Sequence, residues 1–388
     1  MGSPVHNIVV IGGSYVGKAA AQKLAEVVPP THKVLLIEPH AHFHHIFTFP
    51  RFAVVPGHEH KAFIPYTNIF ASTSNAHAIV RARVLAIHPD THTLTIDRPW
   101  LGSTKVPYEY VVIATGTSLT PPSATNEEEK LPSVIYLRNH QDQIKRAKSI
   151  LLAGGGAAGI QMATDIKEVY PDKEVTLVQS RERLMPKFDG QLHDLISARF
   201  RELGIKLVTG ARVIIPAQGF PTQAHPIDVQ LTNGTSIPTD FVILATGQKP
   251  NNDLVANLAT KDKASLINPA NGMIRVRATL QVDDERYDNI FAVGDIADTG
   301  AHKAARPGIA QAEVVVKNVM ALIQDQKPQA RFEVAPAAIH MTLGLTYNVV
   351  FGNPAPSEGR TEPRIVERHD GQEDMAVDNM WKRMGVTI

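Results

Sequence analysis

Residues 7–17 read Asn-Ile-Val-Val-Ile-Gly-Gly-Ser-Tyr-Val-Gly, an apolar run that leads directly into a glycine-rich turn. The chain repeats this phrase, because the apolar run 149–153 leads into Gly-Gly-Gly-Ala-Ala-Gly at 154–159. Each copy is followed later by an apolar strand that ends in Ala-Thr-Gly, at 114–116 and at 245–247. The same order used twice predicts two related dinucleotide-binding units. Two dinucleotides held side by side are what hydride transfer between them requires.

The predicted fold class is α/β, with two Rossmann-like domains of the three-layer ββα type and a small α+β C-terminal domain. We expect the first domain to comprise residues 1–118 and 272–328, because a strand that ends in Gly-Asp returns to it. The second domain is expected at 133–250 and the C-terminal domain at 329–388. The polar, proline-punctuated stretch 120–132 is expected to cross between the two large domains.

Local patterns predict several elements. A helix is expected from Val16 to Val27 and another over 307–321, where proline suits the first turn. In the C-terminal domain, paired strands are expected at 338–343 and 346–351. The charged stretch 359–374 is expected to be loose, and residues 375–384 are expected to form a short closing helix.

Composition excludes several classes of protein. The formal net charge is +1 over 388 residues, which gives no electrostatic footprint for nucleic acid. The chain has no cysteine, which excludes disulfides, thiolate metal sites and electron storage on a protein dithiol. The first expected strand leaves no room for a signal peptide, and no run of about 18 apolar residues predicts a membrane span. A cytoplasmic protein is therefore expected.

The first glycine-rich turn is expected to hold an adenine dinucleotide. Its glycines let the backbone approach a pyrophosphate, which would lie on the N-terminus of the following helix. Ser14 stands in place of the second glycine of the G-x-G-x-x-G pattern and is small enough to allow this approach. Glu38 follows the next strand, about 20 residues after Gly17, where a carboxylate binds ribose hydroxyls.

The second turn, with Gly154, Gly156 and Gly159, is intact, but no acid ends its second strand. That strand runs into Gln179, Ser180 and Arg181, so nothing guards the ribose 2′ position against a phosphate. This unit is predicted to accept NADPH, or both nicotinamides. Arg181 or Arg183 is a candidate to bind a 2′-phosphate; the alternative is that Arg181 is a solvated surface charge.

The ordered set of motifs resembles the FAD-dependent pyridine nucleotide-disulfide oxidoreductase superfamily over nearly the whole chain. The segment from His42-Phe43-His44-His45 through Pro50-Arg51 to 61–66 is similar to its apoptosis-inducing-factor-like branch. Within that branch it is similar to the ferroptosis-suppressor-type NAD(P)H:quinone reductases. The resemblance implies FAD as cofactor and NAD(P)H as co-substrate.

The resemblance also implies roles by position. Arg51 and Lys61 would pass near the flavin, and Asp295 would bind the ribityl chain. Gln161 stands where family members usually carry Glu, so it can hydrogen-bond the nicotinamide side only without charge. The whole expected cofactor-binding set is Gly12, Gly13, Ser14, Tyr15, Gly17, Glu38, Arg51, Lys61, Val84, Ala114, Thr115, Gly116, Gly154, Gly156, Gly159, Gln161, Gln179, Arg181, Thr246, Gly247, Gly294, Asp295 and Lys303.

Few catalytic side chains are expected, because hydride transfer needs stacking and distance control more than an acid or base. Lys303 and Arg306 are candidate cations for the charge of the reduced flavin, the alternative being surface ion pairs. His45, or His44, is a candidate to face the flavin or the acceptor. No metal site is expected, because no carboxylate has a suitable spacing to the histidines. The aromatic and aliphatic run 43–52 is expected to be core, the alternative being the lining of an apolar entrance.

The favoured interpretation is an enzyme in which NAD(P)H reduces FAD and the flavin passes electrons to a quinone or another small acceptor. One alternative is an FAD-dependent oxidase of a specific small molecule that uses O₂ and has a degenerate nicotinamide site. Another is a non-enzymatic NAD(P)H-sensing flavoprotein. The C-terminal domain is expected to offer the surface for a homodimer, and no nucleic acid or disulfide is expected as a partner.

Overall fold

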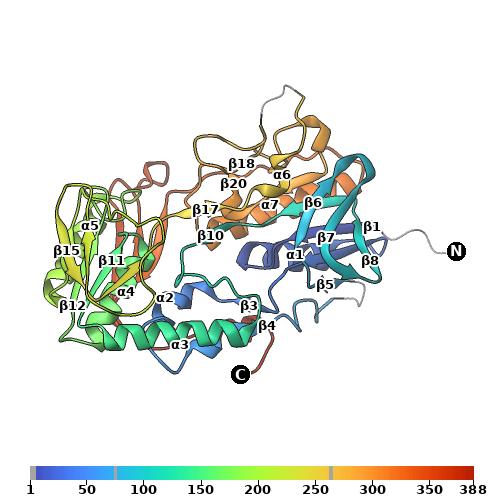
Figure 1. Cartoon of the computed structure of the whole chain (residues 1–388). Coiled ribbons are helices and arrows are strands. Elements are labelled where there is room, and N and C mark those ends of the chain that lie inside the picture. Colours follow the sequence, from blue (N-terminus) through green and yellow to red (C-terminus); the bar gives the residue numbers. More distant parts are fainter. Residues whose placement is uncertain (1–5, 74–76, 262–264) are drawn as a thin grey trace.

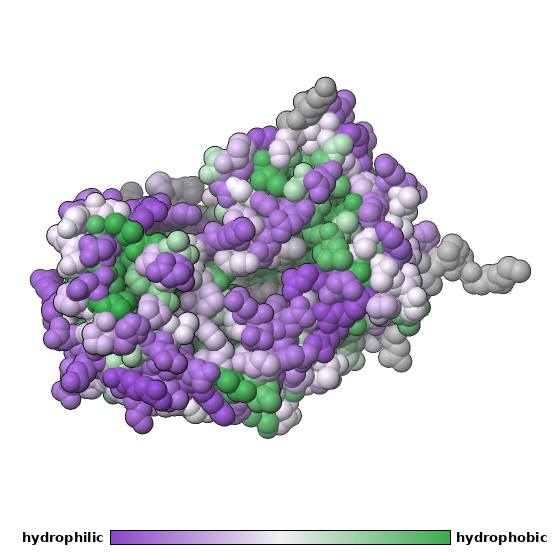
Figure 2. All heavy atoms as spheres, viewed as in Figure 1, coloured by the Kyte–Doolittle hydropathy of each residue, from purple (hydrophilic) through white to green (hydrophobic). Residues whose placement is uncertain are grey.

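The computed structural model describes residues 6–73, 77–261 and 265–388, so the first five residues of the expected first domain lie outside it. Two α/β lobes stand side by side in Figure 1, with the strands β10 and β17 between them. Both lobes are built on parallel sheets, which confirms the predicted α/β fold class. In Figure 2 the surface is hollowed between the lobes.

The first lobe is built on a parallel sheet of order β19-β9-β1-β2-β5. Its strands are almost wholly buried and apolar, as expected for a parallel sheet that is covered on both faces. Helices α1 and α7 pack against each other beside it. The bounds are β1 His6–Ile11, α1 Tyr15–Val27, β2 His32–Ile37, β5 Ala78–Val80, β9 Tyr110–Ile113, β19 Ile290–Ala292 and α7 Ala305–Ile323.

Smaller elements complete this lobe. An antiparallel meander packs its apolar side chains, among them Leu94 and Val106, on the sheet residues Val9 and Leu35. The bounds are β6 Val84–His88, β7 Thr93–Trp100, β8 Ser103–Pro107, β3 His42–His44, α2 Phe49–Phe52, β4 Phe63–Pro65, α6 Asp253–Ala256, β18 Ile274–Arg275 and β20 Ala297–Asp298.

The second lobe repeats the plan with a parallel sheet of order β13-β12-β11-β16. Helices α4 and α5 contact each other and the sheet, and α3 runs along the lower edge of both lobes in Figure 1. The bounds are α3 Lys130–Arg146, β11 Ser149–Ala153, α4 Ala157–Val169, β12 Glu174–Val178, α5 Gly190–Leu203, β13 Lys206–Val208, β14 Ile227–Gln230, β15 Ser236–Thr239 and β16 Phe241–Leu244.

The stretch between the lobes is held in place by charge and by backbone pairing. Glu128 accepts hydrogen bonds from Arg83 at 2.7 Å and from Arg98 at 3.1 Å. After each Ala-Thr-Gly the chain enters one strand of an antiparallel ribbon, β10 Thr117–Leu119 and β17 Gln248–Pro250. This ribbon connects the ends of the two parallel sheets at the same level as the glycine turns.

The C-terminal segment reaches both lobes. Its antiparallel sheet has β21 Ala338–Thr342, β22 Asn348–Gly352 and β23 Arg364–Arg368, and it packs Val349 and Phe351 into the core of the second lobe. Helix α8, Asp378–Arg383, buries Met380 and Trp381 in the core of the first lobe. The two predicted strands and the closing helix are confirmed. No helix among the described residues is long and apolar enough to cross a membrane.

The prediction of a loose 359–374 stretch is wrong for residues 364–368, which form β23 and pair with β22 over the whole length of that strand. The central residues Ile365 and Val366 are partly buried, and Ile365 packs against the core of the second lobe. The charged residues on both sides obscure this short apolar pair in the sequence pattern. An edge strand of a small sheet needs only one buried face, so few apolar residues mark it.

Candidate functional site

The first glycine turn is shaped by backbone contacts that leave no room for side chains. A Cβ on Gly12 would lie 2.5 Å from the carbonyl oxygen of Ala114, and Gly12 has a φ of +101°. A Cβ on Gly17 would lie 1.8 Å from the carbonyl oxygen of Gly12. These contacts press the turn against the start of the Ala-Thr-Gly segment, where Thr115 and Gly116 follow.

Helix α1 begins at this turn with free N–H groups. Ser14 is its N-cap residue but makes no side-chain capping bond, and the first turn carries no acid. Uncapped N–H groups and the positive end of the helix dipole favour an anion. This geometry fits the pyrophosphate of a dinucleotide.

Glu38 closes the turn from the end of β2. Its Oε2 accepts the N–H of Gly13 at 2.5 Å, and its Oε1 accepts the N–H of His40 at 3.0 Å. The hydroxyl of Tyr66 donates to the carbonyl oxygen of Gly13 at 3.1 Å. The carboxylate is buried and lies where a ribose would meet the first turn.

The second turn reproduces this geometry. A Cβ on Gly154 would lie 2.3 Å from the carbonyl oxygen of Ala245, and one on Gly159 would lie 2.1 Å from that of Gly154. Gly156 opens α4 without a side-chain cap, and its Cβ would point into open space. The site therefore has a second uncapped helix N-terminus, suited to a second dinucleotide. Thr246 and Gly247 begin the crossing strand beside it.

Gln179 occupies the place in the second unit that Glu38 holds in the first. It directly follows β12, and its Oε1 accepts the N–H of Gly155 at 3.3 Å and that of Ser180 at 3.2 Å. Its Nε2 donates to the carbonyl oxygen of Arg183 at 3.1 Å. The amide therefore supports the turn as the carboxylate does, but without charge.

The N-terminus of α7 meets the first turn from the other side. A Cβ on Gly308 would lie 2.3 Å from Cγ2 of Val16, so α7 and α1 touch here. Gly294 has a φ of +78° and donates its N–H to Oε1 of Gln311 at 2.7 Å. Asp295 directly follows Gly294 and lies near the contact between α1 and α7. An acid that binds the ribityl chain of a flavin would be expected at this place.

Two lysines surround Asp295. Burial raises the pKa of Asp295, and Lys303 and Lys187 act in the opposite direction. Burial also lowers the pKa of Lys303, whose Nζ donates to the carbonyl oxygen of Ala297 at 2.7 Å. Lys187 comes from the second lobe, where the rings of Phe188 and His302 meet with centroids 5.0 Å apart. Lys187 could not be recognised from the sequence, because the packing between the lobes brings it near the site.

Arg51 is completely buried in a cage of protein groups. Its Nε donates to Oδ2 of Asp165 on α4 at 2.7 Å, and its Nη2 donates to the carbonyl oxygen of Gly344 at 2.7 Å. Its Nη1 donates to the carbonyl oxygens of Gln372 at 3.2 Å and Glu373 at 3.3 Å. Arg51 thus ties α2, α4 and the C-terminal segment together, and its role at the flavin stays a prediction.

Lys61 and Gln161 both contact the C-terminal segment. Nζ of Lys61 lies 3.2 Å from Oδ1 of Asp378 and 3.5 Å from Oδ2 of Asp374. Nε2 of Gln161 lies 3.4 Å from Sδ of Met375, which has a φ of +54°. The face of α4 that carries Gln161 is therefore covered by the C-terminal segment.

His45 is hydrogen-bonded to Tyr15 and is kept neutral by burial. Oη of Tyr15 lies 2.5 Å from Nδ1 of His45, and the N–H of Phe47 donates to the same oxygen at 3.4 Å. Because the N–H of Phe47 donates to Oη, we assign the hydroxyl proton to the bond with Nδ1. Burial lowers the pKa of His45 to about 4, so the ring is neutral at physiological pH and carries its proton on Nε2.

The remaining histidines do not form a metal site. The rings of His40 and His44 lie 4.2 Å apart, and burial lowers the pKa of His44 to about 3. Within the described ranges no group of three His, Asp or Glu side chains could hold a metal ion. The aromatic run is mostly core, since Phe43, Phe49 and Phe52 are fully buried, whereas Phe47 is 48% exposed.

Two predicted residues lie at the edges of the site region. Val84 is buried at the start of β6 in the apolar core below the sheet. Arg181 is exposed on the loop after β12. Their roles toward a cofactor stay predictions, as do those of the other residues in the expected set.

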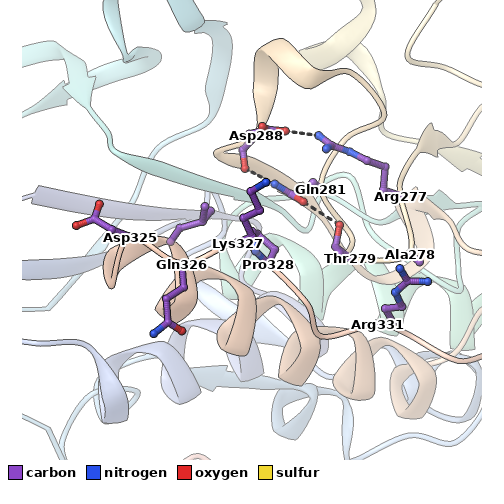
Figure 3. Close-up of a pocket in the computed structure, with 11 residues that line it drawn as sticks. Arg277, Ala278, Thr279, Gln281, Asp288, Asp325, Gln326, Lys327, Pro328 and Arg331 are labelled. Carbon is purple, nitrogen blue, oxygen red and sulfur yellow. Dashed lines mark hydrogen bonds and ion pairs between the residues drawn. The ribbon is translucent and has the colours of Figure 1, made fainter.

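A separate cavity of about 600 Å³ lies at the far end of α7 (Figure 3). Arg277 donates there to Asp288 at 2.6 Å, and Gln281 donates to the carbonyl oxygen of Asp288 at 2.7 Å. The 19 residues of α7 separate this cavity from the glycine turns by about 28 Å. Its walls are ion-paired and polar, and it is not part of the candidate dinucleotide site.

Comparisons with known proteins agree with this geometry. The family model for pyridine nucleotide-disulphide oxidoreductases matches residues 6–330. Fe-regulated protein 8 of Mycosarcoma maydis is 34% identical over 401 residues, covering 98% of this chain and 95% of that protein. Ferroptosis suppressor protein 1 of Mus musculus is 29% identical over 385 residues, covering 97% and 95%. The solved sulfide:quinone oxidoreductase of Aquifex aeolicus superposes with a TM-score of 0.74 at 18% identity, covering 98% of this chain and 90% of that one.

Proposed function

Because the chain belongs to the pyridine nucleotide-disulphide oxidoreductase family, we propose that it is an FAD-dependent oxidoreductase. It takes a hydride from NAD(P)H and passes the electrons to a quinone or another small acceptor. The observation that carries this proposal is the pair of glycine turns, each closed by its own Ala-Thr-Gly contact and each opening onto an uncapped helix.

The residues divide between the two dinucleotides. The first turn, Glu38 and Asp295 would hold FAD, which supplies the hydride acceptor when bound. The second turn and Gln179 would hold the nicotinamide dinucleotide. The free N–H groups of α1 and α4 would donate to the two pyrophosphates, and the β10–β17 ribbon connects the two units.

Electrons must leave the flavin directly to an external acceptor, because the chain has no cysteine to receive them. Phe47 exposes 48% of its surface next to the partly buried Tyr15–His45 pair. An exposed aromatic ring beside a neutral imidazole N–H suits a flat acceptor that has carbonyl oxygens. This pairing supports a quinone over a charged or disulfide acceptor.

The oxidase and sensor alternatives both differ from this proposal at the nicotinamide. A degenerate nicotinamide site is hard to reconcile with an intact second turn and an open α4 N-terminus. A sensor would form reduced flavin but would not turn over with an acceptor.

Anaerobic titration of the FAD-loaded protein tests the proposal. We expect NADPH or NADH to bleach the flavin band, and a short-chain benzoquinone to restore it over many cycles. The G159A variant should retain FAD yet fail to bleach, because its Cβ would meet a carbonyl oxygen at 2.1 Å. Gly352→Ala is a matched control, since its nearest contact would be an ordinary 3.6 Å. Oxidised flavin that neither nucleotide reduces would refute the proposal.

The homodimer expected through residues 329–388 and the cytoplasmic location stay predictions. Sedimentation equilibrium of the FAD-loaded chain tests the first. A monomer at all concentrations would contradict it.

A further inference from the structure

The two dinucleotide-binding units can be compared at the position where a side chain would meet a ribose. Glu38 and Gln179 each follow the second strand of their unit, and each accepts the N–H of the middle residue of its glycine turn, Gly13 or Gly155. The two positions therefore correspond in space as well as in sequence. In the first unit a carboxylate lies there, and in the second a neutral amide does.

This difference determines which group the second unit tolerates at the ribose 2′ position. A carboxylate pairs with a 2′-hydroxyl and repels a 2′-phosphate. The Gln179 amide repels neither, and its three internal hydrogen bonds, to Gly155, Ser180 and Arg183, leave it little capacity for a ribose. Recognition of the adenosine end in the second unit must therefore come from other side chains.

Two arginines stand next to this position on the same loop. Arg181 and Arg183 are both exposed, and among the described residues neither guanidinium has a hydrogen-bond or ion-pair partner. Two hydrogen bonds hold the backbone of this loop. The carbonyl oxygen of Arg181 accepts the N–H of Gly210 at 3.1 Å, and the carbonyl oxygen of Arg183 accepts Nε2 of Gln179. The acid between them, Glu182, lies over Gly210, where a Cβ would meet its Oε1 at 2.6 Å.

We infer that the second unit prefers NADPH, whose 2′-phosphate is bound by Arg181 with help from Arg183. A dianionic phosphate fits two guanidinium groups on a rigid loop, since arginine binds phosphate through two parallel N–H donors. Arg181 is the main ligand, because Nη1 of Arg183 points over the start of α5, where a Cβ added to Gly190 would lie 3.1 Å from it. This inference deepens the proposed function and rests on it.

The test compares the two donors on the intact FAD-loaded protein. We expect NADPH to reduce the flavin with a higher kcat/KM than NADH. The R181A variant should lose about 10- to 100-fold in kcat/KM for NADPH and change little with NADH. Arg212→Ala, an exposed arginine elsewhere on the same lobe, is the matched control and should alter neither donor.

A second variant tests the same position from the opposite direction. Q179E keeps an acceptor for Gly155 and copies Glu38, although it loses the bond to the carbonyl oxygen of Arg183. It should shift the preference toward NADH. Binding of NADP⁺ and NAD⁺, followed by calorimetry, gives a readout apart from turnover. A wild-type preference for NADH, or an R181A loss that is equal for both donors, overturns the inference alone. If neither donor binds or reduces the flavin, the proposed function falls with it.

Discussion

The buried Arg51–Asp165 pair is expected to be a major determinant of stability. Replacing Arg51 by Met removes one ion pair at 2.7 Å and three bonds to carbonyl oxygens, and leaves Asp165 buried without its cation. Oδ1 of Asp165 has no hydrogen-bond partner among the described residues. Removing one partner of such a pair costs about 3–5 kcal/mol in the free energy of unfolding.

This loss should depend on pH. Burial raises the pKa of Asp165 from 3.8 to about 6, even though Arg51 pulls it down. Without Arg51 the pKa of Asp165 in the folded protein rises further. Between the pKa values of the unfolded and folded states, Asp165 is therefore protonated in folded R51M and ionised in the unfolded chain. The variant is therefore most stable below the ordinary aspartate pKa and loses stability as pH rises through the native one. The deficit relative to wild type should be smaller near about pH 5 than near about pH 8. The loss of the three bonds to carbonyl oxygens contributes at both pH values.

Urea unfolding of the FAD-loaded protein, followed by circular dichroism at both pH values, measures this. The R51M/D165L double variant is the control, because an apolar pair leaves no buried charge and should recover much of the loss at the higher pH. A deficit in the free energy of unfolding below about 1 kcal/mol, or one that is the same at both pH values, would show that R51M does not leave an uncompensated buried carboxylate at Asp165.

Three further outcomes are expected. Gly17→Ala should abolish FAD retention, since its Cβ would lie 1.8 Å from the carbonyl oxygen of Gly12, and the ratio of flavin to protein after purification measures this. Tyr15→Phe should leave His45 neutral, because burial keeps the pKa of His45 low, but both neutral tautomers should then be populated, because the hydrogen bond to Nδ1 is lost. Imidazole ¹⁵N shifts identical to those of the wild type would contradict this. Lys303→Met should slow flavin reduction about tenfold by removing a cation beside Asp295, as measured by stopped-flow bleaching, with an unchanged rate as the contrary result.

The paired turns were predictable because their requirements are local. Gly12, Gly17, Gly154 and Gly159 are required by contacts within one strand–turn–helix unit and its Ala-Thr-Gly partner, so the sequence records them directly. Gln179 was recognised as a missing acid, but only the structure shows that its amide supports the turn.

Two helices were missed although their signals were present. Helix α5 buries Leu192, Ile196 and Phe200 at helical spacing, begins at the Asp189 cap and ends at Gly204 in the left-handed conformation. The start of α3 was interpreted as a domain crossing, because Pro132 was taken as a break when it lies in the first turn of the helix.

Contacts between distant segments could not be predicted from one sequence. Arg51 and Asp165 are 114 residues apart, and nothing in either local pattern indicates the other. The same is true of Lys187 in the second lobe, whose charge acts to lower the pKa of Asp295 in the first; its neighbour Phe188 packs on His302. These groups meet through the packing of whole lobes, which local propensity does not encode.

The C-terminal segment connects the two lobes by packing into both. Its sheet is embedded in the core of one lobe and its helix in the core of the other, where Nε1 of Trp381 also donates to the carbonyl oxygen of Lys61 at 2.8 Å. Together with the β10–β17 ribbon it fastens the lobes at two separate places, so neither place can serve as a free hinge. The gap across which a hydride travels is then set when the chain folds, and turnover should proceed without a closing motion and with little sensitivity to solvent viscosity.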